Sequence, residues 1–539
     1  MNQHITQKPI TGFSCKLQEN LTRFLPLLLL LLGALLRLAY LGIVPEGIHQ
    51  DESFSVLNAL GLLHEGTDTA GRTMPVYLSD WGDGQSALYS WLMIPLLLLN
   101  GGRANLLLAR LPQAIVSVFT LWCVYCLIKH MFGKNAGLWA LFALAICPWH
   151  IMMSRWGLDA NLAPGFLIFS FYFFIRGMEQ QKYLLLSSLF YGLTLYCYAV
   201  IWPIVPIMLL LQIAYGLYHK KLHINRYSLL SALLLFALAL PLLLYVCVNS
   251  ELIPEITLPF LTIPKASGYR GSEVAFSLPE MFANLKTSLR LFLFQNTGSP
   301  YDILLPWGLF YDIGRLFMVV GVLCLIAKVT KSFLKKEFAW EVLLFIQLLG
   351  GGIVCLLVSP RLHQVNAVFI PLVLCEGYGL FQTARFLSEK KAIIGKAFIC
   401  GTVALNLFCL ILFQKDYYTN YKKTVNAYFG QGIKECVEYA LTQCEETGLK
   451  TITAEKGAQW PRLLLYTETL PSEYLASVEY DVAPAPASFD SHGIHINTRI
   501  DYNNISSESI YIIYFTDVPV FEEQFELTQF YDWYVAVPK

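Results

Sequence analysis

The sequence predicts a polytopic α-helical membrane protein with a small α/β domain at its C-terminal end. Of its 539 residues, 56% are hydrophobic and 14% are charged, whereas charged residues make up about a quarter of a typical soluble domain. The apolar residues gather in long runs that stop abruptly at Phe413, after which the composition becomes polar. We therefore expect a membrane region over residues 1–413 and a separate domain over residues 414–539.

The apolar runs set the expected number of membrane spans. A helix needs about 20 residues to cross a hydrocarbon core of about 30 Å. Eleven runs approach that length, at residues 24–40, 111–128, 136–153, 162–175, 183–200, 201–218, 228–248, 312–327, 339–358, 363–383 and 393–413. A shorter run at 87–99 contains Pro95 and fits an interfacial or re-entrant segment better than a span. We expect about eleven transmembrane helices, with a helical outer loop at 42–110.

The distribution of cations sets the expected orientation. If the run at 87–99 does not cross the membrane, the cationic loops all lie on the side of the N-terminus, and that side is cytoplasmic by the positive-inside rule. These loops contain Lys129 and Lys134, Arg176 and Lys182, Lys220, Lys221 and Arg226, Lys328 to Lys336, and Arg385 to Lys396. The C-terminal domain is then expected outside the cytoplasm, as are the long polar segments 42–110 and 249–311.

Charge balance and cysteine placement exclude two classes of function. Lys plus Arg and Asp plus Glu each total 38, so no net field attracts nucleic acid, which we do not expect as a partner. The 13 cysteines lie mostly inside apolar runs, with no CxxC motif and no Cys/His ligand spacing, and are expected to be core residues.

The C-terminal domain shows alternating helix and strand patterns. We expect a helix at 421–442, strands at 450–454 and 510–515, a helix at 520–530 and a final strand at 533–537. This alternation predicts a small α/β domain. No repeat or phosphate-binding motif indicates its role.

Adjacent acids, Asp51 and Glu52, follow the first apolar run directly. Neighbouring carboxylates repel each other, which favours a raised pKa in one of them and suits a general base. The same residues also suit the N-terminus of a helix over 53–63, whose dipole they complement. The spacing alone favours the helix interpretation, and the two are compatible.

A third acid, Asp159, follows Arg155 at the outer end of the third predicted span. The expected topology places Asp159 on the same face of the membrane as Asp51, so these two acids from distant segments can share a site. The alternative is a helix cap, formed by Asp159 or Asn161 ahead of the next span.

Further residues are candidates for binding a cation or a phosphate. Asp80 and Asp83 could supply oxygens to a divalent cation, although Asp83-Gly84 is typical of a turn. His49 could ligate a metal, but no closed ligand motif includes it, and a surface histidine is the favoured interpretation. Guanidinium groups match phosphate at an outer membrane boundary, with snorkelling as the alternative. The candidate arginines are Arg103, Arg110, Arg155 and Arg361.

The order of these motifs resembles the GT-C superfamily of polytopic glycosyltransferases, and within it the family 39 type protein O-mannosyltransferases and bacterial aminoarabinose transferases. The resemblance covers roughly residues 24–413, and the order of the motifs is more specific than any one of them. The matching features are Asp51-Glu52 after the first helix, Leu-Tyr-Ser-Trp-Leu at 88–92, Arg110-Leu111-Pro112, Pro148 to Arg155 followed by Asp159, and Arg361 with Asn366 to Pro371.

The resemblance implies roles for the candidate residues. Asp51 would be the general base that takes a proton from an acceptor hydroxyl, Glu52 would orient or polarise the site, and Asp159 would be a second acid on the acceptor or metal side. Arg110 and Arg361 would face a lipid phosphate. Arg155 is a further candidate for binding that phosphate, and Asp83 and His49 are candidates for the metal or acceptor side. Two departures stand out: Gln85-Ser86-Ala87 replaces the family's Lys-Pro-Pro or His-Pro-Pro, and the C-terminal domain shows no β-trefoil pattern.

The resemblance also implies a donor and a location. Nucleotide sugars are not expected outside the cytoplasm, so the donor would be a sugar on polyprenyl phosphate, and a single displacement would invert the anomeric carbon. The acceptor, a protein, a lipid or a polysaccharide, stays open, as does a divalent cation. A bacterial plasma membrane is the expected location. The alternatives are a transporter or lipid flippase, which the position of most charges at span ends disfavours, a non-catalytic scaffold, and an oligosaccharide ligase or polymerase with a diphosphate-linked donor.

Overall fold

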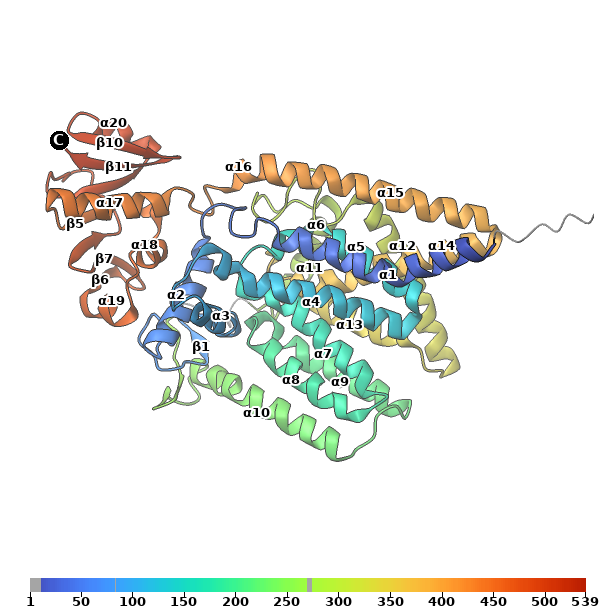
Figure 1. Ribbon diagram of the computed structural model, residues 1–539. Helices are drawn as coiled ribbons and strands as arrows, with labels where there is room; N and C mark the ends of the chain where they lie inside the picture. Colours follow the sequence, from blue (N-terminus) through green and yellow to red (C-terminus); the bar gives the residue numbers. More distant parts are fainter. Residues whose placement is uncertain (1–10, 83, 269–273) are drawn as a thin grey trace, which may run out of the picture.

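Apolar helices build the larger part of the molecule, and a sheet domain follows them (Figure 1). The computed structural model describes residues 11–82, 84–268 and 274–539. Within these residues, 8 helices are long and apolar enough to cross a membrane. They are Leu106–Phe132 (α4), Asp159–Gly177 (η1 and α7), Ala199–Tyr218 (η3 and α9), Arg226–Asn249 (α10), Asp312–Lys335 (α12), Trp340–Leu357 (α13), Asn366–Lys390 (η5 and α14) and Ala392–Val425 (α15, η6 and α16).

Each of the eleven predicted runs contains a helix, which confirms the helical fold class, but in three of these helices the apolar part is shorter than a span. They are α1 (Thr11–Leu38), whose apolar part is Phe24–Leu38, α5 (Lys134–Ile146) and α8 (Leu184–Leu195). The run at 136–153 is divided because Cys147 is extended and Pro148 starts a separate helix, α6 (Pro148–Met153). Proline lacks the N–H that would continue α5.

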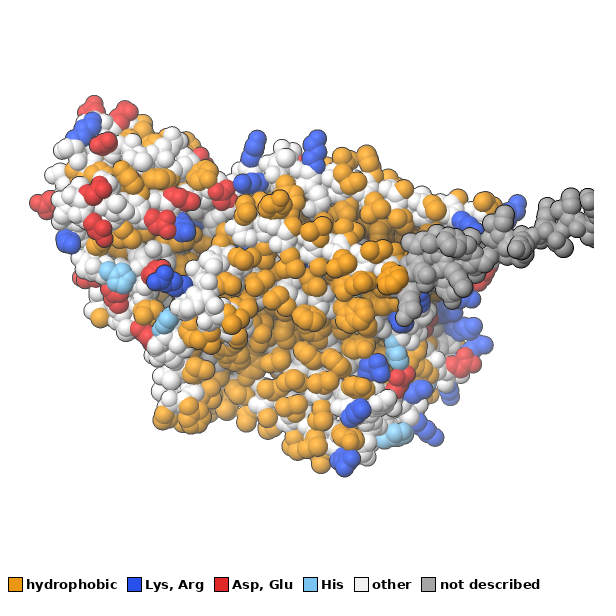
Figure 2. All heavy atoms as spheres, in the orientation of Figure 1, with side chains coloured by type: hydrophobic (Ala, Val, Ile, Leu, Met, Phe, Trp, Pro, Cys, Tyr) orange, Lys and Arg blue, Asp and Glu red, His pale blue; other side chains and the backbone are white. Residues whose placement is uncertain are grey.

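The surface of the helical region is that of an integral membrane protein. On the face shown in Figure 2, hydrophobic side chains cover the helices, while charged side chains gather on the C-terminal domain and at the opposite end of the bundle. Exposed large residues include Leu31, Phe119, Phe236 and Leu323. Since such a continuous apolar belt is costly in water, it indicates contact with lipid.

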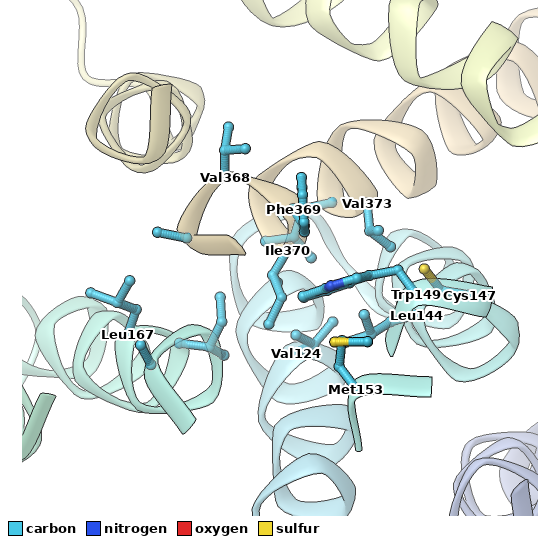
Figure 3. Packing of buried hydrophobic residues seen from close by; sticks show 14 of the residues in the cluster. Val124, Leu144, Cys147, Trp149, Met153, Leu167, Val368, Phe369, Ile370 and Val373 are labelled. Atoms are coloured by element: carbon cyan, nitrogen blue, oxygen red, sulfur yellow. The ribbon is translucent and has the colours of Figure 1, made fainter. Parts of the chain in front are cut away.

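The interior of the bundle is closely packed. Figure 3 shows Trp149 of α6 among aliphatic residues of α4, α5 and α14, and Trp149 meets Phe369 edge to face at 4.9 Å. Helices α12 and α14 approach so closely that a Cβ at Gly321 or Gly379 would collide with the facing backbone. Small residues at such crossings allow helices to pack tightly in a membrane.

The segment between α1 and α4 is largely helical, as the sequence predicts. It forms α2 (Gln50–His64), the short strands β1 (Tyr77–Leu78) and β2 (Gln85–Ser86), and α3 (Leu88–Leu99). The segment between α10 and α12 forms β3 (Ile256–Leu258), β4 (Leu261–Ile263) and α11 (Leu278–Phe294). Strands β1 and β2 pair antiparallel, and Val76 donates a backbone hydrogen bond to Thr262, so the two segments are joined.

The C-terminal domain is a seven-stranded mixed sheet with the order β10-β11-β9-β5-β8-β7-β6. Strand β5 lies parallel to β8 and β9, and the other pairs are antiparallel. The strands are β5 (Thr451–Ala454), β6 (Glu479–Val482), β7 (Ala485–Ser491), β8 (Ile494–Asn497), β9 (Ile510–Tyr514), β10 (Phe525–Phe530) and β11 (Trp533–Pro538). The helices are α17 (Ile433–Thr447), α18 (Trp460–Tyr466), α19 (Pro471–Ser477) and α20 (Val518–Phe521).

The predicted helix at 520–530 is wrong. Helix α20 ends at Phe521, and β10 pairs with β11 from Phe525↔Pro538 to Phe530↔Trp533. A two-residue turn that begins at Tyr531, with φ 57°, joins these strands, and pairing with β11 overrides a local pattern that also fits a helix. The predicted helix at 421–442 is interrupted before α17, at glycines 430 and 432, because both have positive φ.

Candidate active site

The N-terminus of α2 holds the predicted acid pair. The backbone N–H of His49 donates to Glu52 Oε2 at 2.9 Å, and the backbone N–H of Asp51 donates to His49 Nδ1 at 3.3 Å. This reciprocal arrangement is a capping box, which satisfies N–H groups that have no partner in the first turn of a helix. The residues therefore do define a helix N-terminus, and the same cap fixes the direction in which the acids point.

Glu52 and Arg110 form an ion pair with no exposed side-chain surface. Arg110 Nε lies 3.0 Å from Glu52 Oε1, and Nη2 lies 3.2 Å from Oε2. The guanidinium also donates to the carbonyls of Pro45 at 2.6 Å and Gly47 at 2.8 Å, and the backbone N–H of Gly157 donates to Glu52 Oε1 at 2.7 Å. This network ties α2 to α4 and to the segment before η1, which favours a positioning role for both side chains.

Asp51 is the accessible member of the acid pair. Its side chain is 34% exposed. The indole N–H of Trp81 donates to Asp51 Oδ1 at 3.3 Å, and His49 Nδ1 lies 3.5 Å from Oδ2. The Trp81 indole thus holds the carboxylate in place, yet the carboxylate still faces solvent, as a base that acts on a bound substrate requires.

Strand β2 links Asp159 to Asp51. Asp159 begins η1 (Asp159–Leu162), is 6% exposed, and accepts hydrogen bonds from the backbone N–H groups of Ser86 at 3.1 Å and Ala160 at 2.7 Å. The neighbouring Gln85 side chain donates to the backbone carbonyl of Asp51 at 3.3 Å. The segment Gln85-Ser86-Ala87, which departs from the family pattern, therefore contacts both acids, and Ser86 does so through its backbone N–H.

Arg155 is buried among backbone carbonyls. It donates to Ala39 O at 2.6 Å and to Tyr40 O and Val44 O at 3.0 Å each, and its Nε donates to the Tyr417 hydroxyl at 3.2 Å. The side chain holds the turn that leaves α1, so its geometry favours positioning over phosphate binding. Arg37 behaves similarly inside the bundle, where it donates to Leu144 O and Ala145 O.

Arg361 has a different environment from the two buried arginines. It is exposed in the short connection between α13 and η5, and within the described part of the chain its side chain forms no hydrogen bond or ion pair. Its guanidinium is thus available to an anion. Asp83 lies outside the described residues, and among those described no group of three or more His, Cys, Asp or Glu side chains is arranged to hold a metal ion.

His49 is not the surface histidine that the sequence favours, because its residue is 8% exposed. Its ring lies within 6 Å of three aromatic rings, Trp156 at 5.0 Å, Phe429 at 5.6 Å and Tyr301 at 5.8 Å. Burial lowers the pKa of the imidazole below its usual value, so the ring is neutral near pH 7. No local pattern links these four positions, since they come from distant segments.

The C-terminal domain reaches the acid pair through Arg462 of α18. Its Nε donates to Ile48 O, and its Nη2 donates to Tyr428 O, each at 2.8 Å. Burial lowers the pKa of Arg462 to about 10. Phe54 and Leu57 of α2 belong to the hydrophobic core of the C-terminal domain. The domain therefore holds the helix that carries Asp51.

Replacing Arg462 by methionine should loosen the N-terminal end of α2. The change removes two charge-assisted hydrogen bonds and leaves two carbonyls unpaired, which costs about 2 kcal/mol. Hydrogen exchange of residues 46–58 should become about 30-fold faster in R462M, which is the equivalent of about 2 kcal/mol. The exposed Arg499, which pairs with Asp481 on the same domain, provides the control R499M. If hydrogen exchange in R462M is unchanged, Arg462 does not hold the N-terminal end of α2 in place.

Comparisons with known proteins agree with this architecture. The family model described as dolichyl-phosphate-mannose-protein mannosyltransferase matches residues 85–245. The crystal structure of ArnT from Cupriavidus metallidurans bound to undecaprenyl phosphate has 10% identity and a TM-score of 0.53, over 95% of this chain and 97% of that chain. The apo state of the same protein gives 11% identity and a TM-score of 0.52, over 97% and 98%.

A third solved structure has a similar fold. The Archaeoglobus fulgidus oligosaccharyltransferase tethered to an acceptor peptide has 13% identity and a TM-score of 0.50, over 82% of this chain and 63% of that chain. A comparison with curated proteins found no matching sequence. The chain therefore has the fold of these membrane proteins, and its residues 85–245 match the mannosyltransferase family model.

Proposed function

We propose that this protein transfers a sugar from a polyprenyl-phosphate carrier to an acceptor hydroxyl at the outer face of the membrane. The observation that carries the proposal is Asp51, a fixed but accessible carboxylate at the N-terminus of α2, beside the buried Asp159. Support for the donor class comes from the family description, which names a dolichyl-phosphate sugar, and from ArnT, whose structure contains undecaprenyl phosphate.

In the proposed reaction Asp51 takes the proton from the acceptor hydroxyl. The acceptor oxygen forms a bond to the anomeric carbon, the bond from that carbon to the phosphate oxygen breaks, and the electron pair stays on the leaving phosphate. A single displacement inverts the anomeric configuration. Asp159 acts as the second acid on the acceptor side. Glu52 and Arg110 set the position of α2, and we assign them no contact with the phosphate.

Arg361 is the candidate cation for the donor phosphate. We expect R361Q to raise the KM for the donor about tenfold with little change in kcat, because one charge-assisted hydrogen bond to an anion contributes about 1.5–3 kcal/mol. The control R385Q changes an exposed arginine at the other end of α14, where Arg385 pairs with Glu389. If R361Q leaves the KM unchanged, the phosphate binds elsewhere.

We also propose that the chain has two domains with a defined orientation in the membrane. Residues 1–413 form the catalytic membrane domain, and residues 414–539 form a domain that supports α2 from outside the membrane. The N-terminus lies in the cytoplasm and the C-terminal domain lies outside it, in a bacterial plasma membrane. The positive-inside pattern supports this orientation, and so does the attachment of the C-terminal domain to the outer loop through Arg462.

The decisive test is donor turnover in liposomes. Purified protein is reconstituted with a panel of polyprenyl-phosphate sugars, and the release of free polyprenyl phosphate is measured with and without candidate acceptors. Turnover of one donor class supports the proposal. Turnover only of diphosphate-linked oligosaccharides would favour the ligase alternative. If no donor is turned over and the lipid itself moves between leaflets, the protein is a flippase and the proposal is wrong.

A further inference from the structure

A cavity that does not include Asp51 lies between the outer loops and the C-terminal domain. It has a volume of about 260 Å³, just below the range of about 300–1,000 Å³ typical of ligand pockets, and suits a single small ring. The first outer loop, the segment after β4 and the C-terminal domain all contribute to its wall. The aromatic residues that line it are Tyr77, Tyr245, Trp460, Tyr474 and Tyr480.

The lining combines aromatic faces with polar groups. Ser79, Asp80 and Ser267 also line the cavity. Asp80 accepts a hydrogen bond from the backbone N–H of Gly84 at 2.6 Å, which fixes its carboxylate on the wall. A sugar ring presents apolar C–H faces and a rim of hydroxyls, so it matches aromatic walls that carry a few fixed polar groups.

Trp460 supplies an aromatic face to the wall of the cavity. Its residue is 8% exposed, and its ring stacks parallel to Tyr474, with the centroids 6.0 Å apart and the planes at 5°. The stacking holds the indole ring in place, so the wall offers a fixed apolar surface to the C–H face of a sugar ring.

Trp81 connects the cavity to the acid cluster. Its ring lies edge to face with Trp460 at 5.8 Å, and its N–H donates to Asp51. Tyr77 and Asp80, which line the cavity, also interact electrostatically with Asp159. The side chain of Trp81 therefore lies between the wall of the cavity and Asp51, the proposed base.

We infer that this cavity binds a sugar ring of the acceptor, so that the acceptor is a carbohydrate chain or a glycolipid. The role in transfer rests on the proposed function, whereas the binding of sugar does not. The C-terminal domain thereby contributes Trp460, Tyr474 and Tyr480 to substrate recognition, in addition to the contacts of Arg462 that hold α2.

Binding is tested on the full-length protein in detergent micelles by saturation-transfer difference NMR. The probes are the methyl glycosides of glucose, galactose, mannose and N-acetylglucosamine. At least one should bind to the wild type. Y480A should weaken that binding about tenfold, since Tyr480 is 45% exposed and its loss removes a stacking face without disturbing a core. The matched control is Y502A, because Tyr502 is 47% exposed on the same domain.

The role of Trp460 is tested with two substitutions, W460F and W460L. W460F keeps an aromatic ring in the wall and W460L does not, so W460F should bind the sugar more tightly than W460L. The control W533L replaces a tryptophan of the same domain that is 6% exposed and does not line the cavity, and it should leave binding unchanged. Sugar binding by none of the glycosides, or equal binding by the wild type, Y480A and W460L, would overturn the inference.

Donor turnover separates failure of this inference from failure of the proposed function. If the wild type releases polyprenyl phosphate and Y480A binds sugar as well as the wild type, the assignment of this cavity to the acceptor is wrong. The proposed glycosyltransferase function is then still supported. Sugar binding that depends on Tyr480, in a protein that turns over no donor, would preserve the cavity and remove the proposed function.

Discussion

Replacement of Asp51 by asparagine is expected to lower kcat for sugar transfer by about 10²–10⁴-fold, the usual contribution of a positioned general base. Asparagine has nearly the same size and keeps an oxygen that can accept the Trp81 N–H, which lies 3.3 Å from Asp51 Oδ1. It cannot take the acceptor proton. The measurement is the steady-state release of polyprenyl phosphate in liposomes, with the thermal unfolding temperature recorded for each variant.

The control for this prediction is D501N, which makes the same chemical change at an exposed acid of the C-terminal domain. D501N should retain wild-type turnover. The KM of D51N for the donor should stay within about twofold, since a base that acts only in the transition state changes kcat and not ground-state binding. Equal kcat in D51N and D501N would remove Asp51 as the base and shift attention to Asp159.

Substitution of Glu52 by glutamine is expected to destabilise the outer part of the protein by about 3–5 kcal/mol, the typical cost of breaking a buried ion pair by removing one partner. The pair has no exposed side-chain surface, so the positive charge of Arg110 would remain buried and uncompensated. Thermal unfolding, followed by the fluorescence of a thiol-reactive dye or by light scattering, should show a clearly lower transition temperature than in the wild type.

A double variant distinguishes the lost ion pair from general damage. E52Q combined with R110M removes both charges and should be more stable than E52Q alone, because no unpaired charge then stays buried. The matched exposed pair Lys434 and Glu438, 3.5 Å apart, provides the control E438Q, for which we expect no measurable change. If E52Q is as stable as E438Q, the buried pair does not hold α2 in place.

The sequence by itself determined the membrane architecture. Hydropathy acts locally, since each stretch of about 20 apolar residues must satisfy its own backbone as a helix in lipid. All eleven predicted runs therefore contain helices, and the run at 87–99 forms a helix that is too short to span a membrane by itself. The acid pair at Asp51 and Glu52 was placed at a helix N-terminus by the same kind of local signal, and the capping box bears this out.

Only the tertiary structure decided what the chemistry-bearing residues touch. Arg110 is paired with Glu52, His49 is enclosed by aromatic rings from three other segments, and β10 is a strand because β11 lies beside it. The same holds for Arg462, whose contact with Ile48 joins positions 414 residues apart. These contacts depend on where distant segments meet, and no local pattern of hydropathy or charge encodes that meeting. Helices and their ends were therefore predictable, whereas the partners of the buried charges and the role of the C-terminal domain were not.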